Sequence, residues 1–178
     1  MDRNQKTRMI LLTGDGKGKT TSALGMVLRA VGHGLSVCVI QFIKQSADTG
    51  EARALKQLPG VEHHICGNGF VFPSETATVC EQHAAAAKAG FALACNKLVD
   101  SKIDMLLLDE ICEAVALGLL SEQALLDSLQ TATDGKIIVL TGRNATPSLI
   151  DLCDTVSTIH ASKHGFYDNL PSQPGVEF

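Results

Sequence analysis

The chain has 178 residues, of which 45% are hydrophobic, so it can bury one sizeable core and leaves little for a second domain. We expect one globular domain over residues 1–178. The formal net charge of -4 argues against a general nucleic-acid-binding surface, and we expect no nucleic acid as a partner. No apolar run reaches the ~18 residues that a membrane helix needs. The basic start lacks the apolar core of a signal peptide, so a cytoplasmic protein without membrane attachment is expected.

The first element is an apolar run at 9–12, which predicts a buried strand and leads through a glycine-rich stretch into a helical pattern at 19–31. The stretch reads TGDGKGKTT, residues 13–21. Its glycines let backbone amides approach phosphate oxygens, and the start of a helix adds its positive end. Lys19 is expected to bridge phosphate oxygens, and Thr20 is placed to offer its hydroxyl to Mg²⁺.

This stretch departs from the strict phosphate-loop pattern G-x-x-x-x-G-K-[ST] only at Thr13. The alternative is a glycine-rich turn beside a surface helix, which leaves the two lysines inside the turn unexplained. We therefore predict a nucleotide triphosphate site. Its candidate residues are Thr13, Gly14, Asp15, Gly16, Lys17, Gly18, Lys19, Thr20 and Thr21.

The middle of the chain contains a buried strand at 37–40, a weaker strand at 61–66 and an alanine-rich helix at 78–100. Gln41 and Lys44 follow the first of these strands, where they either reach a ligand or lie in a connecting loop. The helix is expected to open at Thr78, because Thr78 and Glu81 have capping-box spacing. Its packing face is expected to comprise Ala87, Phe91, Ala94 and Leu98.

A buried strand at 105–108 ends in two acids, Asp109 and Glu110. Nucleotide-binding sheets place ligands at such carboxyl ends, so both side chains are expected to face the phosphate loop. Either carboxylate can hold Mg²⁺ directly or through water. A helix N-terminus with two acids favoured by the helix dipole is the alternative, and the glycine-rich loop makes the ligand role the better interpretation.

The last third predicts a helix at 121–132 that opens at Ser121, a buried strand at 137–140 and an alternating edge strand at 155–160. Arg143 follows the buried strand and either meets phosphate or lies exposed in a loop. Strands that alternate with helices imply a parallel sheet. The fold class is therefore expected to be α/β, a RecA-like P-loop three-layer fold with a mostly parallel central sheet flanked by helices.

Six cysteines contain no C-x-x-C pair, and six histidines share no metal-ligand spacing. We expect the cysteines to be mostly small core residues of a reduced protein. The histidines are expected to face solvent or to make satisfied core contacts.

In order along nearly the whole chain, the stretches TGDGKGKTTSALGMVLRAVGHG, VIQFIK, GE at 50–51, LLLDEI, TGR and KHGF resemble the bacterial P-loop ATP:corrinoid adenosyltransferases. A threonine at the position of Thr13 is usual in that family. The resemblance implies transfer of the 5′-deoxyadenosyl group of ATP to a Co(I) corrinoid, with release of triphosphate. Cobalamin or a biosynthetic corrinoid is the implied acceptor, together with an unidentified electron donor and a homodimer.

By the same resemblance, Lys17 and Lys19 hold phosphates, while Thr20 and Glu110 surround magnesium, with Asp109 as a second candidate there. Arg143 is kept as a candidate ATP-binding residue. The segment CGNGFVFPSE, residues 66–75, resembles the family's loop beneath the corrin ring. Phe70 and Phe72 fall on the positions of aromatic residues that displace the lower axial ligand of cobalt; ordinary core packing is the alternative. Catalytic candidates are thus Lys19, Glu110, Phe70 and Phe72.

Two other functions share the phosphate loop and the acidic pair. A nucleoside kinase of the thymidine-kinase kind normally carries a four-cysteine zinc element, which the cysteine spacing here does not match. An ATP-dependent switch would bind a partner without turnover.

Overall fold

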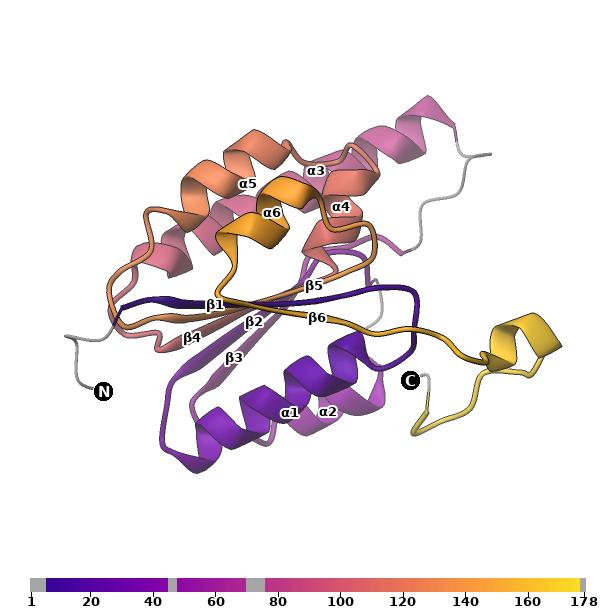
Figure 1. Cartoon of the computed structure of the whole chain (residues 1–178), viewed down its shortest axis with the longest axis horizontal. Helices are drawn as coiled ribbons and strands as arrows, with labels where there is room; N and C mark the ends of the chain where they lie inside the picture. The colour runs from indigo at the N-terminus through magenta and orange to yellow at the C-terminus, as the bar shows by residue number, and fades with distance from the viewer. Residues whose placement is uncertain (1–5, 45–47, 70–75, 177–178) are drawn as a thin grey trace.

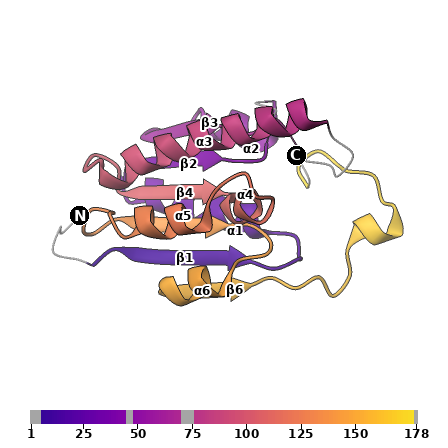
Figure 2. The same ribbon diagram turned by 90° about the horizontal axis from the view of Figure 1, so that it is seen from above.

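The computed structural model describes residues 6–44, 48–69 and 76–176. Within them, the sheet has six strands in the order β3-β2-β4-β5-β1-β6, and every neighbouring pair is parallel. The strands are β1 Arg8–Thr13, β2 Val37–Gln41, β3 Val61–Ile65, β4 Met105–Asp109, β5 Ile137–Thr141 and β6 Thr155–Thr158. Since all six run the same way, their carboxyl ends share one edge (Figures 1 and 2).

Helices cover both faces of the sheet, as an all-parallel sheet requires (Figure 1). On one face lie α1 Lys19–Gly32 and α2 Gly50–Leu55; on the other lie α3 Ala77–Val99, α4 Ile111–Ala116, α5 Glu122–Leu129 and α6 Pro147–Leu152. A short 3₁₀ helix, η1 Gly165–Asp168, extends beyond the carboxyl edge (Figure 1). The expected three-layer α/β fold is confirmed.

Successive side chains of the central strands point to opposite faces of the sheet, so they pack into two separate hydrophobic cores. Leu106 and Leu108 of β4 belong to the core beneath α3, whereas Met105 and Leu107 pack with α1. The four side chains are between 0% and 4% exposed, which explains why the strand reads as an uninterrupted apolar run. The strand predicted at 155–160 is confirmed as an edge strand, since β6 ends the sheet beside β1.

One predicted helix start is wrong. Helix α3 begins at Ala77 with Thr76 as its N-cap residue, so Thr78 lies inside the first turn and no capping box forms. The backbone of Thr76 already opens the helix, because its carbonyl accepts a hydrogen bond from Cys80 N. The start at Ser121 is confirmed: its hydroxyl accepts from Ala124 N at the start of α5, which ends at Leu129, earlier than the predicted 132.

Three short helices, α2, α4 and α6, were not predicted. Each has only six residues, too few for a helical period to stand out in the sequence. None of the helices in the described ranges is both long and apolar enough to cross a membrane.

Candidate functional site

The glycine-rich loop joins β1 to α1 at the carboxyl edge, and its glycines serve two different purposes. Gly18 is the N-cap residue of α1 with φ 118°, a left-handed conformation that favours glycine. A Cβ on Gly14 would lie 2.5 Å from the carbonyl oxygen of Ile159, and one on Gly16 would lie 2.8 Å from that of His160. The first two glycines therefore let the loop pack against the segment after β6.

Hydrogen bonding supports this correction to the expectation that all three glycines turn their amides towards phosphate. The amide of Gly16 donates to Ile159 O at 2.8 Å, so its N–H points to the segment after β6 and not into the concave side of the loop. Asp15 and Lys17 of the loop are exposed, as is Thr21 in the first turn of α1.

Lys19 is the first residue of α1, directly after the loop, and is only 7% exposed. Its Nζ donates to Gly16 O at 2.9 Å, which holds the ammonium inside the turn. Burial lowers the pKa of Lys19, while the negative charge of Glu110 opposes this shift. The turn thus holds a largely buried lysine whose hydrogen-bond acceptor is a neutral carbonyl.

Asp109, at the end of β4, is fully buried and joins three elements. Its Oδ1 accepts from Thr20 Oγ1 of α1 at 2.8 Å and from Thr141 Oγ1 of β5 at 2.7 Å. Its Oδ2 accepts from Gln41 Nε2 of β2 at 2.9 Å. The expectation that Asp109 faces the loop is confirmed, and these bonds show a carboxylate fixed in one orientation.

Gln41 and Lys44, whose roles the sequence left undecided, lie in different surroundings. Gln41 is buried and bonded to Asp109, so it belongs to the site. Lys44 forms an ion pair with Glu51 of α2, and burial lowers its pKa while the charges of Asp109 and Glu110 raise it. Lys44 is therefore a cation close to the acidic pair.

Glu110 occupies a left-handed conformation, with φ 60° and ψ 26°, between β4 and α4. It is the N-cap residue of α4, yet its side chain makes no capping hydrogen bond, while its amide donates to Thr141 Oγ1. Burial and the neighbouring charge of Asp109 raise the pKa of Glu110 to about 7, against the opposing effect of Lys19. The backbone of Glu110 is strained, and its carboxylate makes no capping hydrogen bond and lies near the buried Lys19. Such a combination indicates a functional position.

This raised pKa predicts a pH-dependent stability of the protein without nucleotide or metal. A folded-state pKa above the unfolded value means that the folded state binds more protons between pH ~4.5 and ~7, so stability falls as pH rises through that window. We expect Glu110→Gln, which mimics the protonated acid, to match the parent protein at pH ~4, below the unfolded pKa, and to exceed its unfolding free energy by about 2 kcal/mol at pH ~8.

Urea denaturation across this pH range, in the presence of a chelator, measures the difference. A constant difference between the two proteins at all pH values would contradict the expected titration.

Arg143 follows β5 and is exposed, which agrees with the interpretation that it lies in a connecting loop. Its charge nevertheless lowers the pKa values of both Lys19 and Glu110, so it lies close enough to the loop to act on it electrostatically. The preceding Gly142 has φ 139°, and a Cβ there would meet Glu113 N at 2.9 Å. Phe70 and Phe72 lie outside the described residues.

His63 is the functional neighbour that sequence reasoning did not select. Its Nε2 lies 2.9 Å from Gln41 Oε1, so the hydrogen-bonded set extends from β3 to the Asp109 carboxylate. The sequence signal is weak, because one histidine of an adjacent pair in an edge strand has no distinguishing spacing.

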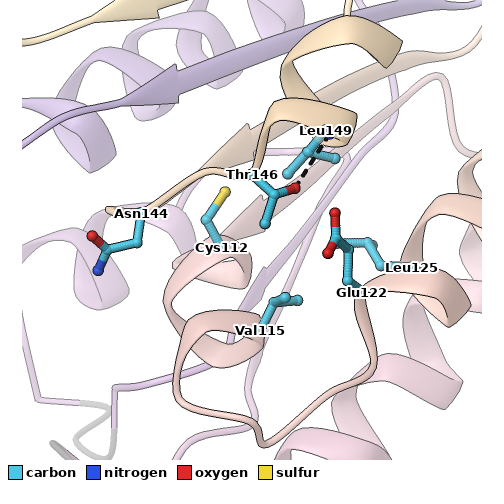
Figure 3. A pocket seen from close by; sticks show the side chains of 7 residues that line it. All are labelled: Cys112, Val115, Glu122, Leu125, Asn144, Thr146 and Leu149. Atoms are coloured by element: carbon cyan, nitrogen blue, oxygen red, sulfur yellow. Dashed lines mark hydrogen bonds between the residues drawn. The ribbon is translucent and has the colours of Figure 1, made fainter.

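Two further groups of side chains lie away from this site. Between α4, α5 and α6 is a small hollow lined by residues such as Cys112, Glu122 and Leu149, on the opposite face of the sheet from α1 (Figures 1 and 3). It contains neither the glycine-rich loop nor Asp109.

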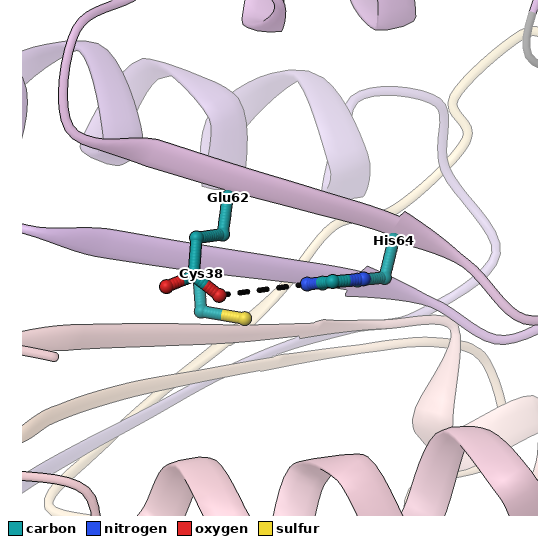
Figure 4. A group of neighbouring side chains, drawn as sticks. All are labelled: Cys38, Glu62 and His64. Carbon is teal, nitrogen blue, oxygen red and sulfur yellow. Dashed lines mark ion pairs between the residues drawn. The ribbon is translucent and has the colours of Figure 1, made fainter.

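The second group joins Cys38 of β2 to Glu62 and His64 of β3, with ligand atoms within 4.8 Å of one another (Figure 4). Glu62 Oε2 is already 2.5 Å from Lys97 Nζ and 3.6 Å from His64 Nε2. Burial raises the pKa of Cys38 to about 12, so its thiol stays protonated. We interpret the group as a charged cross-strand contact at the sheet edge.

All six cysteines are free thiols. Cys38 and Cys112 are buried in the core, and Cys66 and Cys153 are partly exposed and pack against it. Cys80 and Cys95 are partly exposed, so the expected core position applies to four of the six.

The fold and the site together define a class: a three-layer α/β protein with a glycine-rich loop between its first strand and first helix, facing the acidic end of β4. Residues 5–178 match the family model of ATP:corrinoid adenosyltransferase BtuR/CobO/CobP. The chain belongs to this family, whose enzymes transfer an adenosyl group from ATP to a corrinoid.

Similar proteins agree with this assignment. The corrinoid adenosyltransferase of Pseudomonas aeruginosa is 36% identical over 177 residues, covering 99% of this chain and 86% of the relative. That of Escherichia coli K12 is 35% identical, with 99% and 88% covered. The corrinoid adenosyltransferase CobA of Salmonella typhimurium is 36% identical over 170 residues, with 96% and 85% covered.

Proposed function

We propose that the carboxyl edge of the sheet binds the triphosphate of ATP together with Mg²⁺. The observation that carries this proposal is the hydrogen bond from Thr20 Oγ1 to Asp109 Oδ1, 2.8 Å long. Because the hydroxyl donates its hydrogen bond to the carboxylate, the lone pairs of its oxygen are left to face a cation. Hydroxyl and carboxylate oxygens are the ligands that suit Mg²⁺, so the residues present fit this ion.

Thr20 and Glu110 would hold the ion directly, with Asp109 as a second carboxylate beside them. When bound, magnesium supplies positive charge next to the triphosphate. Lys19 would leave Gly16 O for a phosphate oxygen, and Lys17 and Arg143 would add charge from the exposed side of the loop. These residues orient the leaving group and neutralise it.

In the proposed reaction, Co(I) of the corrinoid donates its electron pair to C5′ of the ribose. A cobalt–carbon bond forms as the bond between C5′ and the triphosphate oxygen breaks, so the protein needs no nucleophilic side chain of its own. ATP would lie with C5′, and not the terminal phosphorus, exposed to the corrinoid. Positioning and charge stabilisation of triphosphate then account for the role of the loop.

Phe70 and Phe72 would form an apolar wedge beneath the corrin ring, as the family resemblance implies. Excluding the lower axial ligand from Co(II) would ease its reduction by the electron donor, whose identity is unspecified. We further propose that the protein acts in the cytoplasm as a homodimer.

The products test the proposal directly. Incubation with ATP, magnesium and chemically reduced cobalamin should give one inorganic triphosphate for each light-sensitive adenosylated corrinoid, because attack falls on C5′. Ion chromatography measures triphosphate, and the corrinoid absorption spectrum measures the cobalt–carbon product.

A phosphorylated acceptor with stoichiometric ADP and no such product would instead indicate a kinase. Nucleotide-dependent partner binding without turnover would indicate a switch.

A further inference from the structure

A chain of hydrogen bonds leads from the edge strand β3 into the acidic site. His63 of β3 is bonded to Gln41 of β2, and Gln41 is bonded to Asp109 of β4. The three residues are consecutive across the sheet because the strand order is β3-β2-β4. Gln41 is 1% exposed and Asp109 is 0% exposed, so water does not compete for the bond between them, while His63 at the sheet edge is half-buried.

The direction of each bond follows from its chemistry. An ionised carboxylate only accepts hydrogen bonds, so the amide nitrogen of Gln41 must face Asp109 Oδ2, as it does at 2.9 Å. The amide oxygen of Gln41 therefore faces His63 Nε2. A carbonyl oxygen cannot donate, so His63 Nε2 must carry a proton.

The consequence concerns the orientation of Gln41. Without a donor at position 63, the amide oxygen of Gln41 loses its partner, and the bond to Asp109 Oδ2 alone restrains rotation of the terminal amide. The Asp109 carboxylate has its other oxygen bonded to Thr20 and Thr141. A fixed amide on Oδ2 thus completes the set that determines the plane of this carboxylate.

We infer that His63 is a positioning residue which, through Gln41, holds Asp109 in the orientation required by the magnesium of bound ATP. This inference rests on the magnesium–ATP site proposed above. It assigns a role to one histidine of the adjacent pair. The side chain of His63 lies on the same face of the sheet as Gln41. His64, the next residue of β3, lies on the opposite face beside Glu62 (Figure 4).

The test uses ATP binding to the full chain, measured by titration calorimetry in saturating magnesium and again in excess chelator. The ratio of the two affinities is the magnesium-dependent gain. His63→Phe keeps a ring of similar shape and removes the donor; it should reduce this gain about three- to tenfold and leave ATP affinity in chelator unchanged. His63→Gln retains an N–H donor and should recover much of the gain.

Two comparisons separate positioning from general packing. The matched control His64→Phe should leave the gain within about twofold of the parent protein, since it lies on the other face. Adding His63→Phe to Gln41→Leu should cause less than about a twofold further change, because His63 acts only through Gln41. Thermal unfolding of each variant verifies that it is folded.

An unchanged gain in His63→Phe overturns the inference, as does a full additional loss in the Gln41→Leu background. An equal loss in chelator and in magnesium would make His63 a packing residue. If the parent protein shows no magnesium-dependent gain while still forming adenosylated corrinoid, the magnesium site and this inference both fail and adenosyl transfer stands.

Discussion

Replacing Lys19 by methionine should lower the affinity for ATP about ten- to a hundredfold. Lys19 is buried at the start of α1, where its ammonium donates to the neutral carbonyl of Gly16 at 2.9 Å. A phosphate oxygen would replace that carbonyl by a charge-assisted bond, and loss of such a bond costs about 1.5–3 kcal/mol. Methionine keeps the length of the side chain and removes the charge.

The folded state should tolerate this change, because burial already lowers the pKa of Lys19 and so opposes the charged form. We expect the unfolding free energy without nucleotide to stay within about 1 kcal/mol of the parent value. Lys88→Met is a matched control, since Lys88 is exposed on α3 across the sheet. Calorimetric titration with ATP measures the effect, and similar affinities for the two variants would remove the phosphate site.

Replacing Gly14 by alanine should destabilise the protein by about 2–4 kcal/mol. Gly14 has φ 97°, which an alanine adopts only with strain, and its Cβ would lie 2.5 Å from the backbone oxygen of Ile159. Backbone atoms cannot move aside as the end of a flexible side chain does. The loop and the segment after β6 must therefore separate.

Gly25→Ala provides the opposite control within the same region. Gly25 lies in α1, is exposed, and has no atom within 4 Å of an added Cβ. Alanine there should stabilise the protein by about 0.5–1 kcal/mol through its higher helix propensity. Urea denaturation measures both variants; a Gly14→Ala protein as stable as the parent would mean that the loop can relax away from Ile159.

Resemblance and local pattern predicted most of the scaffold. Buried parallel strands have apolar residues on both faces, so β2 and β4 appeared as unbroken apolar runs. The order of loop, acidic pair and family motifs was enough to predict the adenosyltransferase family, which the comparisons confirm. Chemical type and spacing along the chain carry this information, and neither depends on which strands become neighbours.

Helix starts and short helices were predicted less well, because local signals compete there. Thr78 and Glu81 have the spacing of a capping box, yet the backbone of Thr76 already begins α3. Six-residue helices such as α4 depend on their place in the fold more than on a period in their own sequence.

The residue pattern by itself determined that a glycine-rich loop with Lys19 and Thr20 would follow the first strand and that Asp109 would end another. Only the tertiary structure decided that His63, Gln41 and Asp109 form one hydrogen-bonded set and that Gly14 packs against Ile159. Gln41 and Asp109 are 68 positions apart, and Gly14 and Ile159 lie near opposite ends of the chain. Such contacts are set by strand order and register, which pair β2 with β4 and β1 with β6. The apolar runs of the central strands β2, β4 and β5 require burial on both faces but do not specify which strand lies beside each of them.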